Sequence, residues 1–213
     1  FVEPEIADPA AKKAAEIQAG ANFYGAVKNM QGTFTVLQEC RLPVLAAVQG
    51  GCIGGGVDLI TACDMRFATE DAFITIFETN IGMTADVGTF PRITKLIADG
   101  LARELAYTGR RMHADEGKTA GLFNNVYKDH EAMMAAVMKM AAEIASKAPL
   151  AIMGCKRMMN YSQNHTVEDS LDYIAIWNAS MLQRDEIFEA MKANQEKRQG
   201  EFVDLPPIRK NIG

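Results

Sequence analysis

Three kinds of signal are missing from this sequence, and each absence excludes a class of protein. The four cysteines show no Cys-x-x-Cys spacing, which removes support for a structural zinc site or a thioredoxin-type redox pair. The net charge is −5, so sequence-independent nucleic-acid binding, which needs a cationic face, is disfavoured. The longest uncharged stretch, 42–57, is interrupted by a proline, a glutamine and five glycines, and is therefore not a membrane span.

The chain does contain enough apolar residues for a buried core, at 48% of 213 residues. Apolar periodicity predicts an α/β core over residues 1–130 and a helical region over 131–213. Strand, helix and strand in succession suggest a crossover unit of a buried sheet. The predicted helices cover 10–40 (interrupted at Gly20 and Gly25), 54–62, a segment from 86, 101–108, 131–147, 150–161 and 167–198, and the predicted strands cover 43–48, 65–69, 72–77 and 122–127.

The most informative segment has five glycines in the seven residues 50–56, directly after a predicted strand. Such a run marks backbone that approaches something closely, and at a helix start it offers free N–H groups. A phosphate could bind there, but no Lys-Ser/Thr pair follows as a P-loop requires. An oxyanion hole, in which a backbone N–H polarises a carbonyl, is the second interpretation. A packing loop between helix and strand is the third.

Three carboxylates follow the glycines. Asp58 lies in the first turn of the helix after the glycines, Glu78 follows the strand at 72–77, and Asp86 comes eight residues later. Each has a structural alternative: a dipole-stabilising Asp58, a solvated Glu78 at a strand end, and an Asp86 that caps the next helix. An exposed position suits Asp58 least of the three, because its neighbours in the sequence are apolar.

The stretch 43–66, which includes Gly-Gly-Cys-Ile-Gly-Gly-Gly-Val-Asp58, resembles the core signature of the crotonase (enoyl-CoA hydratase/isomerase) superfamily. The resemblance covers about 42–180. The segment 84–89, Thr-Ala-Asp-Val-Gly-Thr, and the segment 165–182 are similar to the branch of Δ3,5-Δ2,4-dienoyl-CoA isomerases. The resemblance to this superfamily implies a crotonase-like ββα spiral core followed by a helical C-terminal region that mediates oligomerisation.

The resemblance also implies roles for four residues. Gly55 matches the backbone N–H that binds the thioester oxygen, and Glu78 matches the acid/base at C2 of the acyl chain. Asp86 matches a second acid/base at C6, and Asp58 matches the buried carboxylate beside Glu78. Simple hydratases usually carry Glu at position 58 and a small residue at position 86, so the pattern favours an isomerase.

The implied activity is conversion of 3,5-dienoyl-CoA into 2,4-dienoyl-CoA through an oxyanion-stabilised dienolate. The alternatives are an enoyl-CoA hydratase that uses Asp58 and Glu78, and a non-catalytic acyl-CoA-binding scaffold. Neither metal nor redox cofactor is expected, since coenzyme A is part of the substrate. The expected partners are acyl-CoA and further copies of the chain, as a homotrimer or homohexamer, with neither nucleic acid nor membrane. The expected location is the cytoplasm of a bacterium or a mitochondrial or peroxisomal matrix.

The family pattern raises an expectation about the start of the chain. Nothing between Phe1 and Arg41 resembles the opening strands of a crotonase core or the segment that gives the other oxyanion N–H. We expect both to lie in a segment that precedes Phe1.

Overall fold

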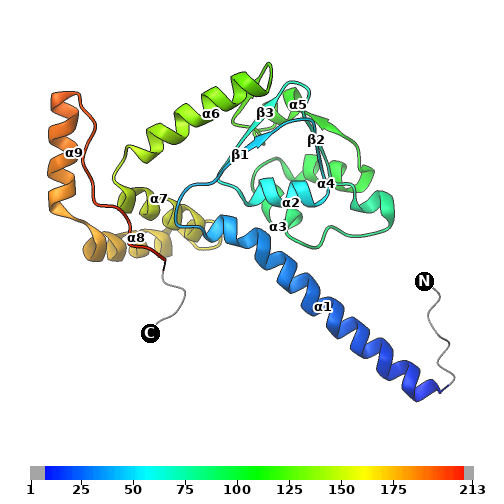
Figure 1. Cartoon of the computed structure of the whole chain (residues 1–213). Coiled ribbons are helices and arrows are strands. Elements are labelled where there is room, and N and C mark those ends of the chain that lie inside the picture. The colour runs from blue at the N-terminus through cyan, green and yellow to red at the C-terminus, as the bar shows by residue number, and fades with distance from the viewer. Residues whose placement is uncertain (1–7, 209–213) are drawn as a thin grey trace.

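The computed structural model describes residues 8–208 of the chain, and the outer ends of the two predicted regions, 1–7 and 209–213, lie outside the described residues. The chain forms helices around two small sheets (Figure 1). None of the helices within 8–208 is both long and apolar enough to cross a membrane.

The first helix, α1 (Pro9–Glu39), runs without a break through Gly20 and Gly25, where interruptions were predicted. The Asp8 side chain caps its start by accepting the Ala10 N–H. Its C-terminal part lies against α2 (Gly55–Ala62), and its N-terminal part extends away from the body of the molecule (Figure 1). No residue of α1 is buried.

Two three-stranded sheets form the centre of the fold. In the first sheet, β1 (Leu45–Val48) and β6 (Asn125–Tyr127) flank β3 (Met65–Thr69), and both pairs are parallel. In the second sheet, β4 (Phe73–Thr75) pairs in parallel with β2 (Gly51–Ile53) and antiparallel with β5 (Met112–His113). Because α2 lies between β1 and β3 in the chain, the predicted crossover unit is confirmed. The prediction missed β2, which lies inside the glycine-rich segment.

The central strand β3 separates two parts of the core because its side chains alternate between the faces of the sheet. Phe67 packs with Met133 and Val137 of α6 (His130–Ala145) on one face. Ala68 belongs to the larger cluster on the other face, together with Val57 and Ile60 of α2. The glycine-rich segment therefore lies on the side of the sheet opposite α6.

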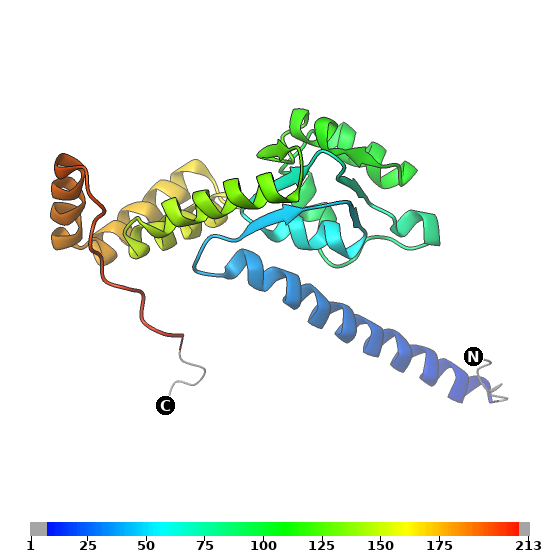
Figure 2. The same ribbon diagram turned by 45° about the horizontal axis from the view of Figure 1, so that its top comes forward.

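The remaining helices surround this centre and continue beyond it. They are the 3₁₀ helix η1 (Glu78–Ile81), α3 (Thr89–Ile93), α4 (Asp99–Thr108), α5 (Ala114–Thr119), α7 (Pro149–Ser162), α8 (Val167–Met181) and α9 (Arg184–Glu196). The single helix predicted over 167–198 is wrong, since Leu182 and Gln183 have extended backbone and separate α8 from α9. Both views place α9 and the N-terminal end of α1 at opposite ends of the molecule (Figures 1 and 2).

One buried lysine ties α7 back to the core. Lys156 is 5% exposed, and its ammonium donates to the carbonyl oxygens of Leu37 and Leu42 and to the carboxylate of Asp64. These acceptors lie at the end of α1, before β1 and before β3. A buried ammonium with three acceptors has every donor satisfied.

Candidate active site

Buried polar atoms without partners gather at the N-terminal end of α2. Within residues 8–208, four buried side-chain atoms have no hydrogen-bond partner: Asp58 Oδ2, Thr69 Oγ1, Glu78 Oε2 and Arg92 Nη1. Three of these atoms belong to Asp58, Glu78 and Arg92, and the charge of Asp58 raises the pKa of each of the other two groups. Native proteins satisfy nearly all such atoms, and the exceptions often mark a site prepared for chemistry.

Asp58 is completely buried in the first turn of α2. Its Oδ1 accepts two hydrogen bonds from the first residue of α3, one from the Thr89 N–H at 2.6 Å and one from the Thr89 hydroxyl at 2.8 Å. Asp58 therefore joins two helices at the site, and the alternative that it is only a surface group favouring the helix dipole is wrong.

Glu78 begins η1, three residues after β4 ends, and it is half-buried. Burial raises the pKa of its carboxyl group, and the charges of Asp58 and Asp86 raise it further, while hydrogen bonds from backbone N–H groups oppose the rise. The structure thus brings the three predicted carboxylates together. A group with a raised pKa and a free oxygen is suited to accept a proton.

The glycine run gives Glu78 its place beside a backbone donor. Gly54 has a φ of +52°, and a Cβ on this residue would come 3.1 Å from Glu78 Oε1. Gly55 is the first residue of α2, and the N–H groups of the first turn have no partner within the helix. Gly55 is also exposed. The positive end of the helix dipole, where the Gly55 N–H lies, therefore begins directly after the residue that lies against the carboxylate.

Asp86 lies in the segment between η1 and α3 and is half-buried. The residue that precedes the first turn of α3 is Gly88, so the alternative in which Asp86 caps this helix is wrong. The Asp86 carbonyl oxygen accepts a hydrogen bond from Gln31 Nε2 of α1 at 2.7 Å. Asp86 also lines a cavity of about 380 Å³ between this segment and α1.

Two residues of this site were not singled out from the sequence. Thr89 holds Asp58, and Arg92 lies one turn later on α3. Thr89 is part of the family-like segment 84–89, so that motif was a usable signal. Arg92 had no such signal, because its partners come from α1, more than fifty residues earlier.

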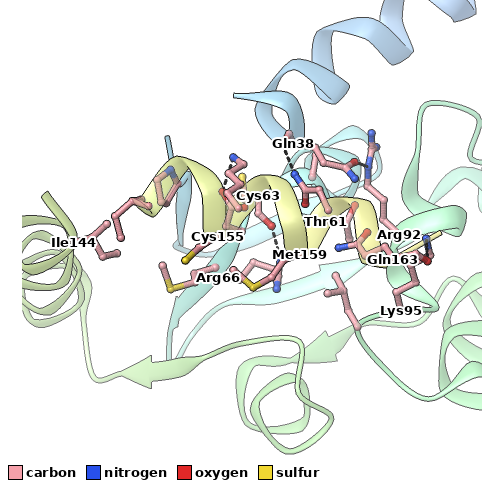
Figure 3. A pocket seen from close by; sticks show the side chains of 18 residues that line it. Gln38, Thr61, Cys63, Arg66, Arg92, Lys95, Ile144, Cys155, Met159 and Gln163 are labelled. Atoms are coloured by element: carbon pink, nitrogen blue, oxygen red, sulfur yellow. Dashed lines mark hydrogen bonds and ion pairs between the residues drawn. The ribbon is translucent and has the colours of Figure 1, made fainter. Parts of the chain in front are cut away.

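A second cavity of about 500 Å³ lies at the opposite end of α2, beneath α7 (Figure 3). None of the four predicted site residues lines it. Four cations line it, and each is hydrogen-bonded within the fold. Lys156 is bound as described above, and Arg66 donates to the carbonyl oxygens of Ile60, Cys63 and Leu122. Lys95 donates to Asn164, and Arg92 donates to Thr35 and Gln38 through two of its three nitrogens. The candidate active site is therefore the carboxylate cluster and not this cavity.

The cysteines and histidines give no second centre. Cys52 and Cys63 are buried, and burial together with the nearby Asp58 raises the pKa of the Cys52 thiol to about 12. Cys52 is thus a neutral thiol that packs as a small apolar group. In the part of the chain that the structure describes, no group of three His, Cys, Asp or Glu side chains could hold a metal ion.

The described site can be compared with known proteins. The family model for enoyl-CoA hydratase/isomerase matches residues 12–205, most of the chain. The chain belongs to this family. A solved structure of enoyl-CoA hydratase from Bacillus anthracis superimposes with a TM-score of 0.78 at 29% identity, covering 85% of this chain and 70% of that one. The crotonase-like α/β fold predicted from the sequence is therefore confirmed.

Curated relatives bear a narrower name. The mitochondrial Delta(3,5)-Delta(2,4)-dienoyl-CoA isomerase of Mus musculus is 45% identical over 85% of this chain and 56% of its own length. The peroxisomal enzyme of the same name from Arabidopsis thaliana is 42% identical over 84% of this chain and 64% of its own. The chain thus spans a little over half the length of these relatives.

Proposed function

We propose that this family member is an isomerase that converts 3,5-dienoyl-CoA into 2,4-dienoyl-CoA. The observation that carries the proposal is the grouping of Glu78 and Asp86 with the buried Asp58, beside the free N–H of Gly55. Two carboxylates that can reach different carbons of a conjugated chain suit a proton shift along that chain. The names of the relatives agree with this chemistry.

The reaction begins with the thioester carbonyl oxygen at the Gly55 N–H. Ionised Glu78 removes a proton from C2, and the electrons of that C–H bond delocalise through the diene onto the carbonyl oxygen. The N–H at the start of α2 stabilises this charge, and loss of one such donor typically costs about 10²–10³ in rate. A proton is then delivered to C6 through the Asp86 carboxyl group, which leaves double bonds at C2 and C4.

Asp58 controls the first of these carboxylates. Its charge raises the pKa of Glu78, which makes Glu78 a stronger base once it is ionised. The two hydrogen bonds from Thr89 hold the Asp58 carboxylate in place.

Hydration of a 2-enoyl-CoA is the second candidate, because the family contains hydratases and the superimposed structure carries that name. It would use Asp58 and Glu78 on adjacent carbons and would not need Asp86. Under both candidates the substrate is an acyl-CoA. We also propose that neither a metal nor a redox cofactor takes part. We place the protein in a mitochondrial or peroxisomal matrix, as its relatives are named, or in the cytoplasm of a bacterium.

A spectroscopic assay with two variants separates the candidates. The wild-type protein is expected to convert 3,5-dienoyl-CoA into 2,4-dienoyl-CoA, detected by the absorbance of the new conjugated thioester. Asp86→Asn should lower this kcat by roughly 10²–10⁴, the usual contribution of a general acid, and spare any hydration. Glu78→Gln should impair both reactions, and Asp71→Asn, at an exposed turn, should impair neither. Brisk hydration of 2-enoyl-CoA without any diene shift would overturn the proposal.

We further propose that copies of the chain meet through α8 and α9. Large apolar side chains on these helices are exposed, among them Leu171 at 62% and Phe188 at 66%. Such surface is costly in water unless it is covered, and the resemblance to crotonases implies a trimer or hexamer.

A further inference from the structure

Arg92 lies between the carboxylate cluster and α1. Its Nε donates to Gln38 Oε1 at 3.1 Å, and its Nη2 donates to Thr35 Oγ1 at 3.0 Å. Figure 3 shows Gln38 and Arg92 side by side below the end of α1. The third nitrogen, Nη1, is buried and has no hydrogen-bond partner within residues 8–208.

The same guanidinium lies against the segment that carries Asp86. Gly88 has a φ of +135°, and a Cβ at this position would collide with Arg92 Nη1 and come 2.9 Å from Arg92 Cζ. Only glycine leaves room for the guanidinium there. Asp86 itself is held by α1 through Gln31, which lies one helical turn before Thr35 and on the same face. Gln31, Thr35 and Arg92 thus hold the Asp86 segment to one face of α1.

The charged groups that face Arg92 from the candidate active site are carboxylates. Burial lowers the pKa of the Arg92 guanidinium, and the charge of Asp58 on α2 partly opposes this by favouring the charged form. Asp86 lines the same cavity as Arg92, and Glu78 is coupled to both carboxylates. From the other side come Lys95, whose ammonium binds Asn164, and the charged groups of the second cavity, Asp64, Arg66 and Lys156.

We propose that Arg92 is a positioning residue for the two proton transfers. It fixes the segment 84–88 against α1, which sets the place of Asp86 relative to Glu78, and its positive charge faces the buried Asp58, the carboxylate whose charge acts on Glu78. It acts through Asp86, Glu78 and Asp58. The inference rests on the proposed function.

Four variants separate the effect of position from the effect of charge. Arg92→Met removes both, and Arg92→Lys keeps the charge but not both hydrogen bonds. Thr35→Val leaves the charge and removes the hydrogen bond from Arg92, together with the one that Thr35 donates to the Gln31 carbonyl within α1. Lys139→Met, at an exposed position on α6, is the matched control for the loss of one positive charge. The readouts are kcat and KM for 3,5-dienoyl-CoA against pH, and the titration of the Glu78 carboxyl carbon by NMR, assigned with Glu78→Gln.

Arg92→Met is expected to lower kcat by about 10- to 100-fold with little change in KM, as a small misplacement of a reacting group does. The acid limb of its pH profile should move to higher pH, because without the cation the negative charge of Asp58, which raises the pKa of Glu78, is no longer offset. Arg92→Lys should lose kcat but keep the acid limb, and Thr35→Val should lose less kcat and keep the acid limb as well. Lys139→Met should match the wild type in both.

The proposal is overturned if folded Arg92→Met keeps kcat within about twofold of the wild type and leaves the Glu78 titration unmoved. It is also overturned if Lys139→Met moves that titration as far as Arg92→Met. Should Arg92→Met fail to fold, wild-type kcat in both Arg92→Lys and Thr35→Val would overturn it. If the wild type converts no dienoyl-CoA, the proposed function fails, while the NMR titration still decides whether Arg92 acts on Glu78.

Discussion

At the scale of single residues, the site depends on polar groups that the fold leaves incompletely satisfied. Asp58 is fully buried with one free oxygen, and Glu78 is half-buried with another. Keeping such groups lowers the free energy of unfolding, and in the proposed mechanism the compensation is a base placed near its acid and its oxyanion donor. The energetic cost of the carboxylates should therefore be visible when one of them is made neutral.

Glu78→Gln should raise the stability of the protein at neutral pH. The folded-state pKa of Glu78 lies above its unfolded value, so the group favours folding when protonated and loses that contribution as pH rises through the folded pKa. We expect the Tm to rise by about 1–3 °C at neutral pH. The gain should vanish once the pH falls below the ordinary pKa of glutamate. Calorimetry at both pH values checks this.

Glu70→Gln, at an exposed turn, serves as the control and should change the Tm at neither pH. A Glu78→Gln protein that is less stable than the wild type at neutral pH would contradict the prediction.

At the scale of elements, the start of α2 decides whether the site can form. Gly54 has a positive φ, which L side chains rarely adopt, and a Cβ there would come 3.1 Å from Glu78 Oε1, so that the carboxylate would have to shift. The glycines of α1 carry no such requirement, since a Cβ at Gly20 would meet no atom within 4 Å. The two positions form a matched pair.

Gly54→Ala is expected to lower kcat about tenfold or more, because the new Cβ displaces the carboxylate from the Gly55 N–H. The strained backbone should also cost about 1 kcal/mol or more of stability. Steady-state kinetics and denaturant unfolding measure the two effects. Gly20→Ala should leave kcat unchanged, and equal kinetics for both variants would disprove this account of Gly54.

Much of this arrangement could be predicted from the sequence. The strand, glycine run and helix at 43–62 have local signatures, and the three carboxylates stand close to them in the chain. The predictions failed where tertiary contacts decide: β2 forms because Gly51–Ile53 pair with β4. Arg92 could not be found because its hydrogen bonds reach Thr35 and Gln38 on a helix that the sequence separates from it.

At the scale of the whole molecule, exposed apolar surface lies on the C-terminal helices α8 and α9. The helices α8 and α9 extend from the body on the side away from the free end of α1 (Figures 1 and 2). Their exposed apolar residues contribute nothing to the described core, whereas α6 and α7 contribute Met133, Val137 and Met158. The division of the chain at residue 130 stays a prediction, with α6 packed on the sheet.

Phe188→Glu should weaken self-association through α9. We expect the wild-type protein to sediment at a multiple of its 23.3 kDa chain mass, and the variant to shift toward that chain mass at the same concentration, because a charge replaces an exposed aromatic ring. Met138→Glu, on α6 and also exposed, is the control and should sediment like the wild type. A wild type that sediments as a monomer at all concentrations would refute the proposed interface.

The hydrogen bonds of Lys156 also bear on the order in which parts of the chain fold during synthesis. Its acceptors precede it by 92 residues at Asp64 and by 119 at Leu37. During synthesis on a ribosome, the sheet can therefore emerge long before the ammonium that joins these three segments. Contacts of such sequence separation form late and slow the folding of a domain. A nascent chain that has been synthesised up to β6 therefore already contains the three carboxylates and both sheets, but it still lacks Lys156, which joins the segments around them.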